Sequence, residues 1–122
     1  MRNDIVSLSV PAQPAYARSV RMMAANLAVL CDMDVDQVED VRMAAEEGFV
    51  YSCATAPDMC DITFEIGGGS FSIEFALGPD EPDPASADSG SVELSLSAVC
   101  DEFFVDDDDV LHLVKRTDGA NA

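Results

Sequence analysis

The sequence predicts a two-layer α/β sandwich of the α+β class, in which a mostly antiparallel sheet of about five strands carries about three helices on one face. Segments with alternating polar and apolar residues occur early, in the middle and late in the chain, which predicts the strands. Between the first and second of these segments the apolar period changes to that of helices. With 122 residues, the chain is expected to form one domain over 1–122.

Periodicity defines the first strand and the first helix. Apolar residues alternate with serines from Asp4 to Val10, and Pro11 ends the strand because it lacks a backbone donor. From Pro14 to Cys31 apolar residues recur every three or four positions, which predicts a helix with one buried stripe. The residues of that stripe are Tyr16, Val20, Met23, Leu27 and Leu30.

A capping box marks the start of a second helix. Asp34 caps its first turn, Gln37 completes the box three residues later, and Pro57 bounds the far end. The stripe expected in the core consists of Val38, Val41, Ala45, Phe49 and Ser52. A neighbouring stripe with steps of four, three and four residues shares one adjacent face; its members are Asp40, Ala44, Glu47 and Tyr51.

A first β-hairpin follows this helix. Apolar residues alternate over 61–66 and again over 70–77, and three glycines at 67–69 form the turn between them. The glycines are not read as a phosphate loop, because strands lie on both sides of them. Residues 78–90 are rich in proline and acidic side chains, which predicts a polar loop.

A second hairpin is predicted near the end of the chain, with strands over 101–105 and 110–115. The four aspartates at 106–109 are interpreted as a solvated turn. A calcium site is the minor alternative, since the glycine and the distal glutamate of the usual calcium loop are missing. The tail at 117–122 is expected to fray.

Charge and cysteine content narrow the class of function. The chain has 24 acidic and 6 basic residues, a formal net charge of -18, so we expect no nucleic-acid or membrane partner. A basic protein partner fits this charge better. The segment before the first strand lacks the apolar core of a secretory signal, which predicts a cytoplasmic protein. Four cysteines without a C-x-x-C pair then predict thiols rather than a zinc site, with a Cys53–Cys60 disulfide as the alternative.

Three consecutive features follow the order of a known family. They are a strand ending at Pro11, a helix carrying Arg18 and Arg21, and the segment Asp-Val-Arg-Met-Ala-Ala-Glu-Glu-Gly over 40–48. In these features the chain resembles the bacterial anti-sigma factors of the serine-kinase type, members of the histidine-kinase-like ATPase superfamily. The resemblance extends through the first hairpin, a loop at the position of an ATP lid and the last hairpin, and so covers nearly the whole chain.

The resemblance also decides an ambiguous segment. Locally, 92–96 alternates like a strand, whereas the apolar residues of 92–100 also fit one helix face. The family has a helix at this position, so the resemblance implies a helix over about 89–100 and a histidine-kinase-like ATPase fold.

A nucleotide site is implied by the resemblance, with altered residues. Glu47 matches the catalytic glutamate that polarises water or a substrate hydroxyl. Tyr51 stands where the family has an asparagine that helps to hold Mg²⁺, and a phenol is a poor ligand for that ion. The adenine-binding aspartate has no counterpart in register near Gly78 and Asp80, and the lid glycines are reduced to Gly90.

These matches lead to three hypotheses. The first is an anti-sigma-factor-like regulator that binds a sigma factor or an anti-sigma antagonist, with ATP binding and serine kinase activity weakened or lost. The second is an active serine/threonine protein kinase that uses ATP and Mg²⁺, with Glu47 as base and with Asp80 or Asp83 supplying the missing contacts. The third is a small acidic interaction domain that shares only the fold. The resemblance also implies a homodimer.

Overall fold

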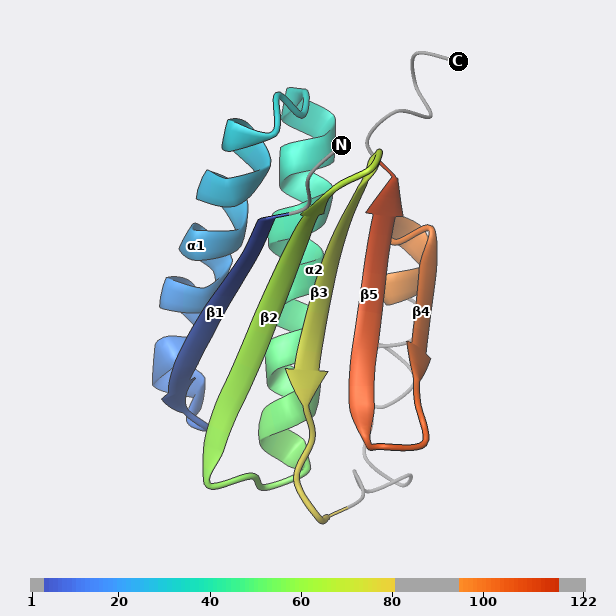
Figure 1. The fold of residues 1–122 in the computed structure, drawn as a ribbon. Helices are drawn as coiled ribbons and strands as arrows, with labels where there is room; N and C mark the ends of the chain where they lie inside the picture. The colour runs from blue at the N-terminus through green and yellow to red at the C-terminus, as the bar shows by residue number, and fades with distance from the viewer. Residues whose placement is uncertain (1–3, 81–94, 117–122) are drawn as a thin grey trace.

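The structure, a computed structural model, describes residues 4–80 and 95–116, which form a five-stranded sheet with helices against one face (Figure 1). A short α-helix over 95–99 precedes the last two strands. The other elements are β1 (Asp4–Pro11), the 3-10 helix η1 (Pro14–Tyr16), α1 (Ala17–Leu30), α2 (Val35–Ala54), β2 (Met59–Gly67), β3 (Ser70–Ala76), β4 (Glu102–Val105) and β5 (Val110–Arg116).

The sheet is antiparallel throughout, with strand order β1-β2-β3-β5-β4. Both long helices and the helix over 95–99 lie on the same face of this sheet (Figure 1). The predicted two-layer α+β class is therefore confirmed for the described part of the chain. Within that part, no element covers the opposite face, which we call the open sheet face.

Both predicted hairpins are confirmed, and each of their strands begins and ends within two residues of its predicted bounds. The β2–β3 turn contains three glycines, and all of them have positive φ: Gly67 at 136°, Gly68 at 63° and Gly69 at 82°. Residues with a Cβ rarely adopt these values, which explains why the turn consists of glycine. The capping box of α2 is also present, because Asp34 Oδ1 accepts from the Gln37 amide at 2.8 Å.

The core lies between the sheet and the helices. Alternate residues of β2, β3 and β5 face the helices and are buried; they are Cys60, Ile62, Phe64, Phe71, Ile73, Phe75, Leu111 and Leu113. Helix α2 packs on them through Val41, Ala44, Ala45, Gly48, Phe49 and Ser52. A Cβ added to Gly48 would lie 2.4 Å from Phe75 Cε1, so α2 approaches the sheet more closely than any larger residue permits.

The predicted buried stripe of α1 is wrong at both ends. Tyr16 is 38% exposed and Leu30 is 70% exposed. Tyr16 belongs to η1, before the α-helical period begins, and Leu30 is the last residue of α1, where the helix ends. Two alanines take their place, so the buried face of α1 consists of Val20, Ala24, Leu27 and Ala28.

Several predictions extend to residues outside the described ranges. The helix predicted over about 89–100 is observed over 95–99, and its first part lies outside, as do Gly90 and the tail at 117–122. All four cysteines are free thiols, so the alternative Cys53–Cys60 disulfide is absent. Within the described residues, no helix has the length and apolar character to span a membrane.

Candidate functional site

Helix α2 positions the predicted site residues through the stripe Asp40, Ala44, Glu47 and Tyr51, which we call the α2 stripe. At its N-terminal end Asp40 reaches β5, where its Oδ2 accepts from Lys115 Nζ at 2.9 Å. Ala44 is buried, and the other three members are half-buried. The stripe is therefore a continuous, partly covered face of α2, as its spacing predicts.

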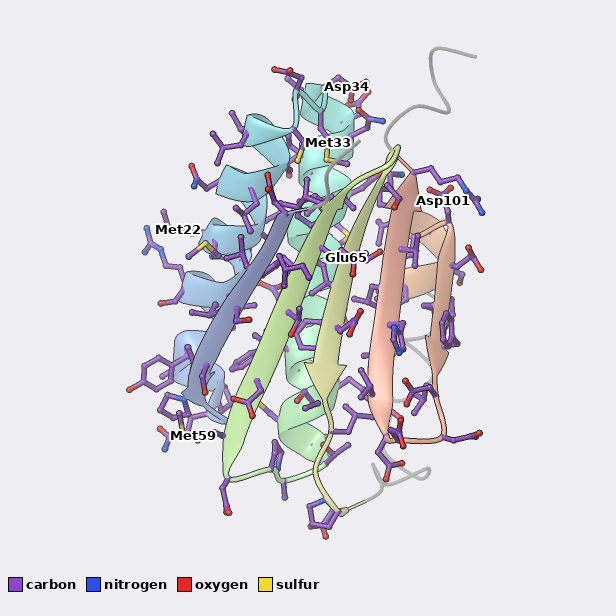
Figure 2. The ribbon with its side chains drawn as sticks, viewed as in Figure 1. Met22, Met33, Asp34, Met59, Glu65 and Asp101 are labelled. Atoms are coloured by element: carbon purple, nitrogen blue, oxygen red, sulfur yellow. The ribbon has the colours of Figure 1, made fainter. Side chains whose placement is uncertain are left out.

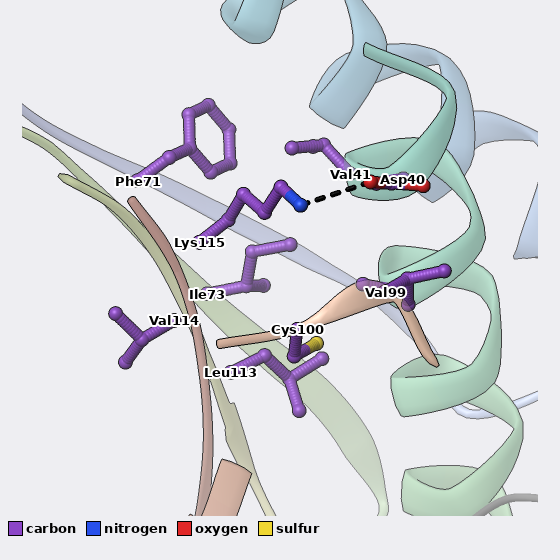
Figure 3. A pocket seen from close by; sticks show the side chains of 10 residues that line it. Asp40, Val41, Phe71, Ile73, Val99, Cys100, Leu113, Val114 and Lys115 are labelled. Carbon is purple, nitrogen blue, oxygen red and sulfur yellow. Dashed lines mark hydrogen bonds and ion pairs between the residues drawn. The ribbon is translucent and has the colours of Figure 1, made fainter. Parts of the chain in front are cut away.

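A small cavity of about 10 Å³ lies beside the N-terminal half of the stripe, between α2, the helix over 95–99 and β5 (Figure 3). Its walls are mainly apolar, including Ile73, Val99 and Leu113. Cavities that take drug-sized ligands occupy about 300–1,000 Å³. This space is too small for a nucleotide.

Three ionisable groups line this cavity, namely Asp40, Cys100 and Lys115. Burial raises the pKa of the Cys100 thiol to about 11, with Lys115 opposing the shift and Asp101 and Asp40 adding to it. The pKa of Lys115 is raised above its ordinary value. Burial lowers this pKa, but the hydrogen bond to Asp40 and the negative charges of Asp40 and Asp101 together outweigh burial. At neutral pH the site thus holds a protonated thiol and a charged ammonium, neither of which is a nucleophile.

The C-terminal end of α2 is joined to the chain after β3 by hydrogen bonds to Thr55. The Gly78 amide donates to Thr55 Oγ1 at 2.7 Å, and the Asp80 amide donates to the Thr55 carbonyl at 2.9 Å. Thr55 Oγ1 in turn donates to the Ser52 carbonyl at 2.6 Å. A Cβ on Gly78 would lie 2.3 Å from the Thr55 carbonyl oxygen, so only glycine permits this close approach.

Four of the five predicted site residues thus lie along the C-terminal half of α2. Glu47 and Tyr51 lie four residues apart on the helix, and Thr55, four residues later, is its C-cap. The amides of Gly78 and Asp80 donate hydrogen bonds to Thr55. The fifth predicted residue lies outside the described ranges. Thr55 was not predicted from the sequence, because no local pattern indicates that its hydroxyl accepts a hydrogen bond from the amide of Gly78, 23 residues later.

Among the described residues, the donor set at this end of α2 does not fit Mg²⁺ and ATP. Tyr51 packs against the core and offers only a phenol. The Gly78 amide is already engaged by Thr55, and Asp80 donates its amide to the Thr55 carbonyl while its side chain is exposed. Glu47 remains the only carboxylate at these predicted positions on α2. Over 4–80 and 95–116, no three His, Cys, Asp or Glu side chains are grouped so as to hold a metal ion.

The open sheet face forms a second surface of functional interest. Strand alternation places carboxylates from three strands on it, namely Asp61 and Glu65 of β2, Glu74 of β3 and Glu102 of β4. Figure 2 shows Glu65 over the middle of the sheet. The apolar side chains among them are Ile5, Val114 and Phe104. This face is acidic and is not covered by any described element.

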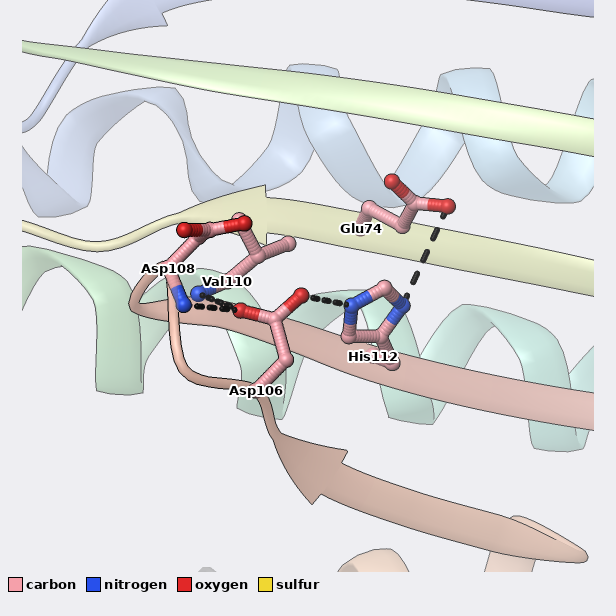
Figure 4. Close-up of polar contacts among 5 residues, drawn as sticks. All are labelled: Glu74, Asp106, Asp108, Val110 and His112. Atoms are coloured by element: carbon pink, nitrogen blue, oxygen red, sulfur yellow. Dashed lines mark hydrogen bonds and ion pairs between the residues drawn. The ribbon is translucent and has the colours of Figure 1, made fainter.

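The single histidine also lies on the open sheet face, within a polar cluster (Figure 4). His112 Nε2 lies 2.7 Å from Asp106 Oδ2, and its Nδ1 lies 3.9 Å from Glu74 Oε2. The Phe104 ring stacks on the imidazole at 4.7 Å between centroids. No local sequence pattern indicates this cluster, because Glu74 lies on β3 and Asp106 lies in the turn before β5.

The aspartate turn before β5 is held by hydrogen bonds from its own backbone to the side chain of Asp106. Asp106 Oδ1 accepts from the amides of Asp108 at 2.8 Å and Val110 at 3.1 Å. The hydrogen bond with His112 is the main cause of a lowered Asp106 pKa; burial opposes this shift, and the hydrogen bonds from the two amides add to it. These contacts support the interpretation as a solvated turn rather than as a calcium loop.

Comparison with known proteins gives no relative from which to transfer a function. No protein-family model matches the chain, and no curated protein matches it.

Proposed function

We propose that the chain is a regulatory protein of the anti-sigma-factor type, which acts by binding a protein partner and in which ATP binding and serine kinase activity are weakened or lost. The resemblance over residues 8–48 supports the family, and the order of strands and helices is compatible with a histidine-kinase-like ATPase fold. The partner is a sigma factor or its antagonist.

The acidic open sheet face is the observation that carries this proposal. It offers carboxylates on three adjacent or near-adjacent strands, with isolated apolar side chains between them. Complementary charge steers a basic partner and aligns it, while the apolar side chains supply contact area. A basic region of a sigma factor has the matching chemistry.

The altered nucleotide residues support the loss of kinase chemistry. Phosphoryl transfer depends on Mg²⁺ and on backbone amides that hold the phosphates. At the positions implied by the resemblance, the metal ligand is replaced by Tyr51, and the Gly78 amide bonds to Thr55. Partner binding needs none of these groups, so it survives their replacement.

Binding to purified sigma factors from the source genome tests the proposal. We expect one of them to bind with a micromolar or lower Kd and to lose transcription activity in vitro when bound. Glu65→Lys, at the centre of the open sheet face, should raise that Kd about tenfold or more. The matched control is Asp58→Lys, which makes the same charge change in the exposed segment between α2 and β2 and should leave the Kd nearly unchanged.

Two results would contradict the proposal in different ways. If a folded protein binds neither a sigma factor nor an antagonist, the anti-sigma function is wrong and the fold-only hypothesis is favoured. If Glu65→Lys and Asp58→Lys weaken binding equally, the open sheet face is not the binding surface. Circular dichroism of each variant establishes that the fold is retained.

A further inference from the structure

We propose that a pocket at the end of the sheet where β1 begins binds a small amphipathic amine, that is, an organic cation with an apolar body. The pocket lies between the last turn of α1, the first residues of β1 and the β2–β3 turn, and it occupies about 460 Å³. We call it the hairpin-end pocket. This inference goes beyond the proposed function and does not depend on it, because it concerns a small molecule and the side of the sheet opposite to the open sheet face.

The pocket exists because the sheet and α1 separate toward the N-terminal end of β1, where α1 also ends (Figure 1). Every second residue of β1 faces the helices, and burial along this series decreases from Val10, 8% exposed, through half-buried Val6 to exposed Asp4. On the opposing helix, Leu27 is buried, whereas Leu30 is 70% exposed. Core side chains therefore fill the space between the layers at one end and leave it open at the other.

The glycine turn between β2 and β3 forms one rim of this pocket. Its three residues, Gly67, Gly68 and Gly69, all line the pocket, and none of them carries a side chain that could obstruct the entrance. The volume of the pocket lies within the range of about 300–1,000 Å³ that is typical of sites for small organic molecules. The glycine run, which the fold uses as a turn, thus also keeps this pocket accessible.

Apolar side chains from both layers provide a surface for the body of a ligand. Leu27 of α1 and Ile66 of β2 line the pocket from opposite sides. Burial, together with the charges of Asp32 and Asp4, raises the pKa of the Cys31 thiol, which also lines the pocket. A neutral, half-buried thiol behaves as a small hydrophobic group. These walls favour an aromatic or alkyl body over a polar one.

The charge around the pocket selects a cation. Asp4 is the cross-strand partner of Ile66, so both side chains are placed on the helix side of the sheet. The C-terminal end of α1, which carries a partial negative charge, borders the pocket, and its last turn has no basic residue. No basic side chain is found among the described residues that line the pocket. With a net charge of -18 on the chain, an ammonium group is attracted and an anion is repelled.

Titration with tryptamine, an indole that carries an ethylammonium group, tests the proposal. Because the chain contains no tryptophan, the indole fluorescence comes from the ligand alone. In about 0.15 M salt we expect saturable binding with a Kd of about 0.1 mM or lower. Indole-3-propionate has the same body with a carboxylate in place of the ammonium, and it should not bind.

Two pairs of variants test the two parts of the pocket. Val6→Phe fills the pocket and should raise the Kd about tenfold, whereas Ile5→Phe adds the same ring at the adjacent, 65% exposed position on the other side of the strand and should leave the Kd nearly unchanged. Asp4→Asn removes the charge at nearly constant volume and should raise the Kd about threefold. Its control is Asp58→Asn, the same change at an exposed position near the other end of β2.

Alkylation of the thiols locates the bound amine. Cys31 lines the pocket, whereas Cys53 is a half-buried free thiol outside it. Tryptamine should therefore slow the reaction of Cys31 with iodoacetamide and leave the reaction of Cys53 unchanged, as measured by peptide mass spectrometry.

Several results would overturn the inference. They are absence of saturable tryptamine binding by the folded protein, equal affinity for indole-3-propionate, and equal effects of Val6→Phe and Ile5→Phe. Bound tryptamine that leaves Cys31 unprotected would place the ligand elsewhere and would also overturn it. Circular dichroism establishes that each variant folds, and the comparison of Asp4→Asn with Asp58→Asn decides the matter if Val6→Phe does not. The sigma-factor experiment reports on the open sheet face, so failure of one proposal is distinguishable from failure of the other.

Discussion

Lys115, near the end of β5, forms an ion pair with Asp40 in the second turn of α2, with Nζ and Oδ2 separated by 2.9 Å. The two residues are 75 positions apart in the chain. Both side chains are largely covered, with 21% and 35% exposed. This contact joins the last strand to the helix that carries the predicted site, and it closes one side of the small cavity shown in Figure 3.

Removing either partner should lower stability at neutral pH. In a double-mutant cycle with Lys115→Met and Asp40→Asn, we expect a coupling of about 1 kcal/mol from urea unfolding. The more exposed pair Arg116–Glu102 should give a smaller coupling and is the control. Because the folded pKa of Lys115 is raised above 10.5, the coupling is complete below that pH and is lost as the pH rises through the folded value. Equal coupling for both pairs would contradict the importance of burial.

The close approach of α2 to the sheet leads to a second prediction. Gly48→Ala places a Cβ 2.4 Å from Phe75 Cε1 and 3.0 Å from Leu113 Cδ1, which should cost about 1–3 kcal/mol. Trimming the ring relieves the clash, so Phe75→Leu should destabilise the Gly48→Ala protein less than it destabilises the natural one. If the two substitutions lower the free energy of urea unfolding additively, the clash is relieved by movement of residues other than Phe75, and the prediction is wrong.

The Thr55 hydroxyl should control the protection of the Gly78 amide. Thr55→Val keeps the shape of the side chain but removes the acceptor, so the Gly78 amide should exchange with solvent much faster. Thr55→Ser retains the hydroxyl and should retain protection. The Asp80 amide bonds to the Thr55 backbone carbonyl and provides an internal control in the same exchange experiment. Unchanged exchange at Gly78 in Thr55→Val would rule out this role.

The hydrogen bond from His112 should set the titration of Asp106. Carboxyl-carbon NMR should show the Asp106 pKa below its ordinary value of 3.8, and His112→Ala should move it back toward that value. Because the folded pKa is lowered, the contribution of Asp106 to stability is present above about pH 3.8 and is lost as the pH falls through the folded pKa. An unshifted Asp106 in the natural protein would contradict the geometry in Figure 4.

Most of the fold follows from the sequence because it depends on local periodicity. The alternation in β2 and β3 and the capping box at Asp34 are short-range signals, and the structure places both as expected. The exposed ends of the α1 stripe were mispredicted, because Tyr16 and Leu30 have the right spacing and chemistry for burial. Their exposure depends on where the helix begins and ends, which periodicity locates poorly.

Less of the candidate site than of the fold could be predicted from the sequence. The α2 stripe was predicted because its members share one helix. Thr55, the Asp40–Lys115 pair and the His112 cluster each depend on contacts between residues far apart in the chain. The grouping of Arg42 with Arg18 and Arg21 likewise depends on the packing of α1 against α2. Single-sequence patterns carry no information about these distances.

A calorimetric titration with ATP, with and without Mg²⁺, tests most directly the claim that this is a partner-binding regulator without kinase chemistry. A ligand at a hundred times its Kd stabilises the folded state by about 2.7 kcal/mol, so the unfolding temperature provides a second readout. The account predicts no heat of binding and no thermal shift up to millimolar ATP. Micromolar, Mg²⁺-dependent binding would contradict it and would make phosphorylation by the Glu47→Ala variant the next measurement.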